Sequence, residues 1–356
     1  MGPGRLAGML AETAVALDEV SAAHAARLRG LDPLLGPPPP LVPGEDGDLI
    51  TVAGPVHPRA AADSAAGTAD SAAGTAGSGA GAAGSGTGGL VGFAVARVRE
   101  VDVGSLDASW SAAQVYQVSA RVAGPDPGGA LDSLLRQWRE TLPEEAAEDS
   151  AAALMWPSRD TVTAPVLIRH GLSPLVVIAA RPAGRAEPAD VPAGVTVRRA
   201  VGTDLADIVA LRLATIRYDA QFGVVRERPA TADLLRQHSE RFFARDDPWV
   251  WVAERDGAVA GMVAVDQPPH ADWIAGLTSV GPVAYVDVLG MYPGSRGTGA
   301  GGALLAHAHQ ALDEAGVAVT LLHHALPNPL STPFYGRHGY RPLCTFWETR
   351  PATTLR

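Results

Sequence analysis

Arg296-Gly297-Thr298-Gly299-Ala300-Gly301 lies between an apolar run, Val283 to Met291, and a segment with apolar residues at helical spacing, Ala303 to Ala315. The first pattern is typical of a strand and the second of a helix, so the glycines lie at a strand-to-helix turn. Glycines let backbone amides approach a ligand closely. The new helix presents unpaired N–H groups and its positive dipole end at the same place. The turn is therefore a candidate site for a phosphate or pyrophosphate, and Arg296 adds a forked cation.

The elements around this turn follow the order β-α-α-β-β-β-α-β-α-β. A hairpin is predicted at Asp256-Gly257, and Thr203 and Asp204 are expected to begin the first helix. We expect a loop at 216–229 between the first two helices. The predicted strands are 195–199, 250–254, 258–265, 283–291, 317–323 and 343–349, and the predicted helices begin near 205, 231, 303 and 331.

The two halves of the chain repeat each other. Residues 164–175 match 332–343 at six of twelve positions, an offset of 168 (332 − 164), and Gly128-Gly-Ala-Leu131 matches Gly301-Gly-Ala-Leu304 at an offset of 173 (301 − 128). Two similar offsets in the same order indicate a duplicated domain.

Changes in composition, with a segment rich in Pro, Gly and Ala between them, divide the chain into two domains. Residues 1–181 form the first, with a helix at 6–31 and strands at 49–53 and 90–97, and residues 194–356 form the second. A Pro/Gly/Ala-rich linker is expected at 182–193. An Ala/Gly/Ser-rich insert at about 57–89 contains a tandem seven-residue repeat, at 62–68 and 69–75, and is predicted to be disordered.

Charge and composition limit the classes of function. The 356 residues carry a formal net charge of −10, which argues against nucleic acid as a partner. No apolar run reaches the roughly 18 residues of a membrane span. Cys344 is the single cysteine, so no internal disulfide is possible and a reducing, cytoplasmic location is expected.

The second half, over about residues 194–350, resembles the GNAT superfamily of acyl-CoA-dependent N-acetyltransferases. The family's pyrophosphate signature, Arg/Gln-x-x-Gly-x-Gly/Ala after the fourth strand, is similar to 296–301 here. The family also carries an Asn, a Tyr seven residues later and a Gly-Phe/Tyr pair, which correspond to Asn328, Tyr335 and Gly339-Tyr340. The chain as a whole looks like a tandem GNAT protein. Its fold class would be α/β (α+β), with two GNAT-like domains that each have a mixed, mostly antiparallel sheet flanked by helices.

The resemblance implies acetyl-CoA as cosubstrate, no metal, and acetyl transfer to a primary amine of a small molecule. The fourth and fifth strands would splay apart, and the backbone of Leu289 and Met291 would bind the pantetheine arm between them. Tyr335 would protonate the leaving thiolate, and Asn328 would support the pantetheine or order a water. The amides of Gly297, Thr298, Gly299, Ala300 and Gly301 would hold the pyrophosphate, together with Arg296.

The acceptor side is less defined. Asp287, on the fourth strand, is a candidate base, directly or through water, or alternatively a solvated carboxylate at a strand end. Tyr218, Asp219 and Phe222, in the loop expected between the first two helices, are candidates for binding an ammonium by charge and cation–π contact, or else ordinary packing residues.

The first copy lacks the same chemistry. At the offset of 173, Ala123 corresponds to Arg296 and Asp126 to Gly299, and a carboxylate there would repel a pyrophosphate. At the offset of 168, Leu167 corresponds to Tyr335. A structural role, or a share in the acceptor cleft, is expected for this half.

Two alternative functions are considered, and the acceptor is left open. Gly297 to Gly302 matches Gly-x-Gly-x-x-Gly, but the turn comes late in its domain and no carboxylate ends the next strand, which disfavours a dinucleotide site. A non-catalytic acyl-CoA-binding or regulatory module is the second alternative. The acceptor itself is open, since tandem members of the family include one that acetylates the cysteinyl amine in mycothiol synthesis. A monomer and a homodimer are both compatible with the sequence.

Overall fold

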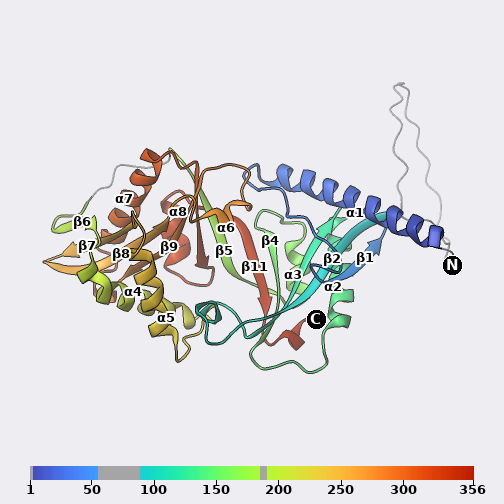
Figure 1. Cartoon of the computed structure of the whole chain (residues 1–356), viewed down its shortest axis with the longest axis horizontal. Helices are drawn as coiled ribbons and strands as arrows, with labels where there is room; N and C mark the ends of the chain where they lie inside the picture. The colour runs from blue at the N-terminus through green and yellow to red at the C-terminus, as the bar shows by residue number, and fades with distance from the viewer. Residues whose placement is uncertain (1–2, 55–88, 185–190) are drawn as a thin grey trace, which may run out of the picture.

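The structure is a computed structural model that describes residues 3–54, 89–184 and 191–356. In these residues the strands form one sheet of eleven strands, in the order β1-β2-β3-β4-β11-β5-β10-β9-β8-β7-β6 (Figure 1). Neighbouring strands are antiparallel except for two parallel pairs, β3 with β4 and β9 with β10. The predicted mixed, mostly antiparallel sheet flanked by helices is therefore confirmed, and the two halves share it.

The first half begins with a long helix and ends with a strand. Its helices are α1 (Pro3–Leu31), α2 (Pro127–Thr141) and α3 (Ala164–Arg169), with a 3-10 turn, η1 (Leu106–Ser109). Its strands are β1 (Asp48–Ala53), β2 (Leu90–Glu100), β3 (Gln114–Val122), β4 (Ser150–Pro157) and β5 (Ser173–Pro182).

The second half follows the element order predicted from the sequence, with one extra short helix, α6. Its helices are α4 (Leu205–Ala220), α5 (Thr231–Phe243), α6 (Asp272–Ala275), α7 (Ala300–Glu314) and α8 (Ser331–Arg337). Its strands are β6 (Val195–Arg199), β7 (Val250–Arg255), β8 (Ala258–Asp266), β9 (Val283–Met291), β10 (Val319–Ala325) and β11 (Arg341–Thr349).

The repeat seen in the sequence recurs in the elements. α2 and α7 coincide at the offset of 173, and β3 and β9 coincide at an offset of 169 (283 − 114). The last strand of each copy lies in the sheet of the other copy. β11 pairs with β4 of the first half, β5 pairs with β10 of the second half, and β5 and β11 pair with each other. The halves are thus joined by exchanged strands at the centre of the sheet.

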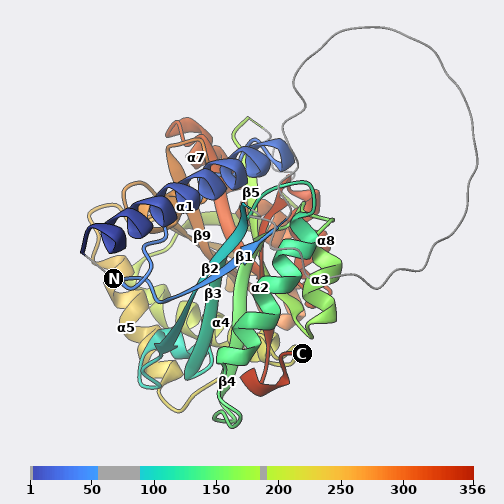
Figure 2. The ribbon, with the colours of Figure 1, turned by 90° about the vertical axis from the view of Figure 1, so that its right-hand side faces the viewer.

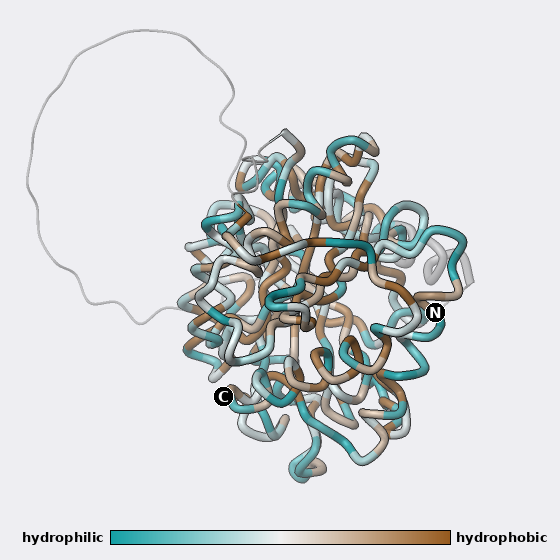
Figure 3. Tube along the Cα trace, turned by 90° about the vertical axis from the view of Figure 1, so that its left-hand side faces the viewer, coloured by the Kyte–Doolittle hydropathy of each residue, from teal (hydrophilic) through white to brown (hydrophobic). Residues whose placement is uncertain are grey.

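Helices cover both faces of this sheet. In the first half α1 lies across one face of β2 and β3, and α2 packs on the other face (Figure 2). In the second half α4 and α5 lie on one side, and α7 packs on β7, β8 and β9. Apolar segments concentrate inside and polar segments lie toward the periphery (Figure 3). The core of the first half includes Trp347 from β11, so the exchanged strand contributes to packing as well as to the ladder.

Most predicted elements are present, and one prediction is wrong. Asp256 and Gly257 turn the hairpin between β7 and β8 with positive φ angles of 52° and 78°. The loop expected at 216–229 begins later, because α4 continues to Ala220 and carries Tyr218 and Asp219 on the helix. The disordered insert expected at about 57–89 and the central part of the expected linker lie outside the described residues. The division into domains at 181 and 194 stays a prediction.

Candidate active site

The two parallel strands of the second half separate at one point. β9 and β10 pair from Val283 and Val319 as far as Val286 and Leu322, and no pairing between them continues beyond those residues. Past that point β10 stays with β5, while β9 stays with β8, where Leu289 and Met291 pair with Val263 and Gly261. The edge of β9 that carries Leu289 and Met291 is therefore open toward the gap, as the family resemblance implied.

The glycine turn at the end of β9 is open to a ligand. Gly297 and Gly299 have positive φ angles of 74° and 85°, and Gly299 is the N-cap of α7. Within the described residues no hydrogen bond is made by the backbone N–H of Gly297, Thr298, Gly299, Gly301 or Gly302. A β-carbon at Gly299 would come within 2.7 Å of Pro192 Cγ, so glycine is required here for space as well as for φ. The first turn of α7 has the unpaired amides of an anion site.

A cavity of about 1250 Å³ connects this turn to the middle of the molecule. At one end it is lined by Arg296 and glycines of the turn, and along its length by Leu289, Met291 and Tyr335. It continues past Asp287 to walls that come from the first half, among them Leu106, Asp107, Trp110, Ser111 and Val115. Residues predicted to bind the cofactor and residues predicted to serve the acceptor thus line one cavity.

Tyr335 lies on α8 and is 9% exposed. Burial, and secondarily the nearby Asp219, raise the pKa of this phenol well above its usual range. The side chain therefore keeps its proton at neutral pH. The ring packs against His324 and Phe334, with centroids 5.6 and 5.2 Å away, and the residue lines the cavity. It has the protonation state that a proton donor needs.

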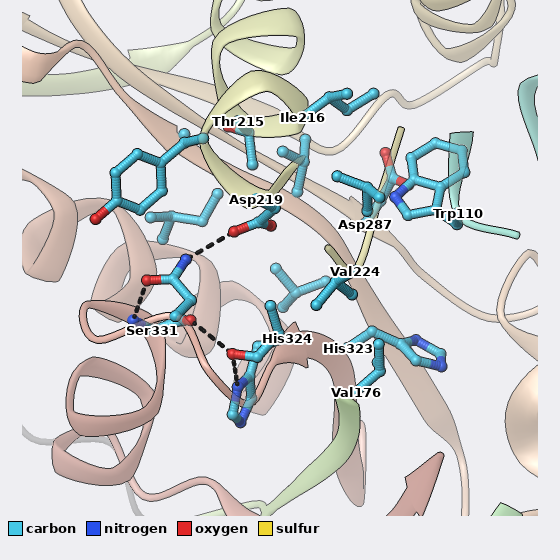
Figure 4. A pocket seen from close by; sticks show the side chains of 18 of the residues that line it. Trp110, Val176, Thr215, Ile216, Asp219, Val224, Asp287, His323, His324 and Ser331 are labelled. Carbon is cyan, nitrogen blue, oxygen red and sulfur yellow. Dashed lines mark hydrogen bonds between the residues drawn. The ribbon is translucent and has the colours of Figure 1, made fainter. Parts of the chain in front are cut away.

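Asn328 holds the start of α8 in place. Its Oδ1 accepts from the backbone N–H of Leu330 and Ser331 at 2.9 and 3.3 Å, and its Nδ2 donates to Asp219 Oδ1 at 2.7 Å (Figure 4). Burial raises the pKa of Asp219, and the hydrogen bond from Asn328 opposes that rise. Both ends of the Asn328 amide are engaged by the protein, which links α8, and Tyr335 with it, to α4.

Phe222 differs from Tyr218 and Asp219 in position. The guanidinium of Arg296 lies over the Tyr218 ring, 4.6 Å from its centroid, so Tyr218 contacts the first residue of the glycine motif. Phe222 packs edge-on against Tyr218 with centroids 5.5 Å apart, and it is not among the residues that line the cavity. Of the three residues predicted to bind an acceptor ammonium, two lie on the cavity wall and both are engaged with residues assigned to the cofactor.

Asp287 occupies an irregular position in β9. Val286 and Val288 face consecutive residues of β8, so Asp287 is the extra residue of a β-bulge, which redirects a side chain. The carboxylate lies 2.6 Å from Arg212 on α4 and 3.5 Å from His238 Nε2 on α5. Burial alone would raise the pKa of Asp287, but Arg212 and His238 outweigh it and hold the pKa well below its usual range. A carboxylate held ionised in this way is a weak proton acceptor.

An aromatic group lies beside Asp287. Tyr285 and His323 Nδ1 share a hydrogen bond of 3.0 Å, and the exposed Trp273 meets the Tyr285 ring edge-on at 5.1 Å. Burial lowers the pKa of His323 to about 4, so this imidazole is neutral. His323 and Trp273 both line the cavity, and sequence patterns gave no signal that α6 would bring Trp273 there.

The first half reaches the site through η1. Arg228 donates to Ala108 O at 2.7 Å and to Asp149 Oδ2 at 2.9 Å, and Ser109 and Thr231 hydroxyls lie 3.2 Å apart. These contacts fix η1 against the start of α5. Residues of the first half thus line the same cavity as the glycine turn, and a share of this half in an acceptor cleft stays a prediction.

The turn of the first half that corresponds to the glycine turn is filled by its own side chain. Asp126 is the N-cap of α2, and its Oδ1 accepts from the Gly129 N–H at 2.8 Å. The carboxylate takes an amide that a phosphate would need and adds a negative charge there.

In residues 3–54, 89–184 and 191–356 no three His, Cys, Asp or Glu side chains group as metal ligands would. No helix in the same ranges has the length and apolar character to cross a membrane.

Part of the chain is similar in sequence to known acetyltransferases. Residues 215–340 match the model of the Acetyltransferase (GNAT) family. A mycothiol acetyltransferase from Frankia alni is 31% identical over 210 residues, which cover 56% of this chain and 60% of that protein. The match therefore spans less than two thirds of the relative's length.

Solved structures of similar proteins were also found. A GCN5-related N-acetyltransferase from Sphaerobacter thermophilus has a TM-score of 0.48 and 18% identity, covering 74% of this chain and 79% of that one. A tandem GNAT protein from the clavulanic acid biosynthesis pathway has a TM-score of 0.39 and 15% identity, covering 74% and 80%. The family match over 215–340 spans the glycine turn, Asn328 and Tyr335, so this part of the chain is similar to the GNAT family of acetyltransferases.

Proposed function

We propose that the protein is an N-acetyltransferase that moves an acetyl group from acetyl-CoA to a primary amine of a small molecule. One observation carries the proposal: the unpaired amides of the glycine turn open into the same cavity as Tyr335 and Asp287. A site for a pyrophosphate and a site for an acceptor are then parts of one space.

The residues present fit acetyl-CoA. The N–H groups of Gly297, Thr298, Gly299 and Gly301, the helix dipole of α7 and Arg296 are suited to the pyrophosphate. Ala300 is the first residue of α7 and is fully buried, so it contributes backbone only. The open edge of β9 at Leu289 and Met291 has the form that an extended pantetheine arm would pair with. Acetyl-CoA supplies the activated acyl group and the thiolate that leaves.

The chain's own groups have three tasks in such a transfer. A backbone N–H at Leu289 or Met291 would polarise the thioester carbonyl, because the carbonyl oxygen gains negative charge during attack. Tyr335 would give its proton to the departing thiolate. Asn328 would act through position, because it holds the start of α8 and thereby Tyr335. Asp287, with its depressed pKa, is suited to orienting a cationic partner and not to taking the proton of an amine itself.

For the acceptor we propose a chemical class, an amine, and not a single compound. Asp287 and the aromatic side chains beside it form a wall suited to an amine, and the first half closes the opposite side. The relative's name directs the first choice of acceptor to the cysteinyl amine of a mycothiol precursor, which we propose as one member of the test panel.

A single assay tests the function. Purified protein is incubated with acetyl-CoA and, in separate reactions, with the mycothiol precursor, glucosamine, spermidine and L-lysine, and products are detected by mass spectrometry. A product one acetyl group heavier than its amine supports the proposal. Binding of acetyl-CoA with no acetylated product from any of these amines would favour a non-catalytic acyl-CoA-binding module.

A further inference from the structure

Three buried polar atoms that make no well-aligned hydrogen bond meet beside the cavity, and one of them, Asp287 Oδ2, is ion-paired with Arg212 Nη2 at 2.6 Å. They are Arg212 Nε, Asp287 Oδ2 and His238 Nε2, and each belongs to a residue that lines the cavity. Two other such atoms occur within the described residues, Arg27 Nη1 and Arg181 Nε, and neither residue lines the cavity. Unsatisfied buried polar atoms are uncommon in folded proteins and call for an explanation at each place. Their grouping on the wall of the cavity that the glycine turn also lines points to a chemical role.

The three side chains are arranged in a series from the protein interior to the cavity. Arg212 has a side chain that is 6% exposed, and it approaches Asp287 to 2.6 Å. Asp287 approaches His238 Nε2 at 3.5 Å, and the His238 side chain is 29% exposed. The carboxylate thus lies between a buried cation and a more exposed imidazole. Catalytic hydrogen bonds are often long before substrate binds, so 3.5 Å is compatible with a working pair.

We propose that His238 is the general base of the transfer, and that Asp287 is the positioning residue that orients its imidazole. This inference rests on the proposed acetyl transfer. Nε2 is the ring nitrogen that faces Asp287, at 3.5 Å, which leaves Nδ1 as the nitrogen that would take the proton. Histidine is the side-chain type that exchanges a proton most readily near neutral pH. Arg212 keeps Asp287 ionised, and an ionised carboxylate fixes the tautomer of the histidine that it faces.

In the proposed transfer the acceptor is bound as the neutral amine, because its ammonium proton has gone to solvent. As the new C–N bond forms and the C–S bond breaks, one N–H proton passes to His238 Nδ1. The leaving thiolate takes the Tyr335 proton, and His238 returns its proton to solvent while Tyr335 regains one. The products are the acetylated amine and CoA thiol.

Charged side chains from several elements lie near His238. Asp287 of β9 lies 3.5 Å from its Nε2, Arg212 of α4 is paired with Asp287, and Asp266 of β8 is paired with Arg245 at 2.6 Å. Asp107 of η1, which packs against α5, and Arg241, one turn along α5, also line the cavity. Among the ion pairs of the described residues, Asp287 is the carboxylate that approaches the His238 ring, so its substitution removes that negative charge.

The test compares His238→Gln with His270→Gln, since His270 is exposed and does not line the cavity. The substrates are acetyl-CoA and whichever of the mycothiol precursor, glucosamine, spermidine and L-lysine the wild type acetylates. We expect His238→Gln to lower kcat by about 10²- to 10⁴-fold, with the KM for acetyl-CoA within twofold of wild type, and His270→Gln to behave as wild type. The acidic limb of the wild-type kcat/KM profile should disappear in His238→Gln. In His238→Ala, added imidazole should restore part of the rate, which a purely structural role would not allow.

A second readout needs no turnover. The ring-nitrogen resonances of His238, followed by NMR, should show a changed tautomer in Asp287→Asn, because the ionised carboxylate fixes the tautomer of the ring in wild type. The same tautomer in the two proteins would overturn the pairing. Wild-type turnover that persists in His238→Gln with an unchanged pH profile would overturn the base role alone. Absence of turnover by the wild type with every amine would overturn the acetyl transfer and the base role together.

Discussion

Asp126 and Gly299 hold equivalent places, as the N-caps of α2 and α7, and differ in what they leave open. The Asp126 carboxylate accepts the Gly129 N–H at 2.8 Å, whereas Gly299 has no side chain and adopts a φ of 85°. A helix start that is capped by its own carboxylate has no place for a phosphate, while the uncapped one has free amides. This difference accounts for a molecule with two similar halves and one glycine turn suited to a cofactor.

Removing the Tyr335 hydroxyl should separate turnover from binding. In Tyr335→Phe the ring stays buried against His324 and Phe334, so the fold and acetyl-CoA binding should be retained. Loss of a general acid should lower kcat by about 10²- to 10⁴-fold. The measurement is CoA thiol release alongside acetyl-CoA affinity by calorimetry. A kcat equal to that of wild type would remove Tyr335 from the mechanism.

The exchanged strands predict that the second half stabilises the first. Trp347 on β11 is buried in the core of the first half, so Trp347→Ala should lower the free energy of unfolding by about 3–5 kcal/mol. Trp273, which is 63% exposed, is the matched control, and Trp273→Ala should cost about 1 kcal/mol or less. Urea unfolding followed by circular dichroism gives both values. Equal losses in the two variants would mean that β11 contributes no core packing.

Buried histidines predict a loss of stability in mild acid. Burial, and secondarily Arg121, lower the pKa of His24 from 6.5 to about 4. The unfolded chain therefore binds a proton at this site from about pH 6.5 downward, while the folded protein does so only near pH 4. The free energy of unfolding should fall as the pH falls between these values, by up to about 3 kcal/mol from this site.

His24→Asn is the variant that checks this effect. Asn has no titration in this range, and its amide can still donate toward Val122 O, which lies 3.2 Å from His24 Nδ1. Urea midpoints at pH 7.5, 6 and 4.5 should fall less steeply for His24→Asn than for wild type. Parallel slopes would show that His24 does not titrate with folding.

The sequence predicted the elements better than their partners. Val283–Met291 and Val195–Arg199 have the predicted boundaries, since apolar runs and turn residues are local signals. The exchange of β5 and β11 could not be predicted, because the apolar pattern of a strand states which face is buried and not which strand lies beside it. The end of α4 was misplaced, since no Pro or Gly breaks the chain between Ile216 and Gln221.

In the candidate site, too, some residues could be predicted from the sequence and others could not. The glycine turn, Asn328 and Tyr335 were predicted from motif and spacing, and they line one cavity, while their roles stay predictions. Arg212 and His238 were missed, because one arginine and one histidine on predicted helices look like ordinary surface residues until α4 and α5 pack over the bulge at Asp287. Only the tertiary structure shows that they share a wall.

The claim that underlies the account is that acetyl-CoA binds at the glycine turn of the second half. Gly299→Asp and Gly299→Asn form a matched pair, because both place a β-carbon against Pro192 and both require a positive φ, which Asn and Asp tolerate better than other side chains. They differ in one negative charge at the pyrophosphate position. Each variant must first show a cooperative melting transition without ligand.

The deciding measurement is the thermal shift of wild type, Gly299→Asn and Gly299→Asp with acetyl-CoA. At a concentration near 100 times its dissociation constant, acetyl-CoA should stabilise the wild type by about 2.7 kcal/mol. We expect a clear rise in Tm for wild type, a smaller rise for Gly299→Asn and none for Gly299→Asp. A folded wild type whose Tm does not change with acetyl-CoA, or equal shifts in the Asn and Asp variants, would contradict the account.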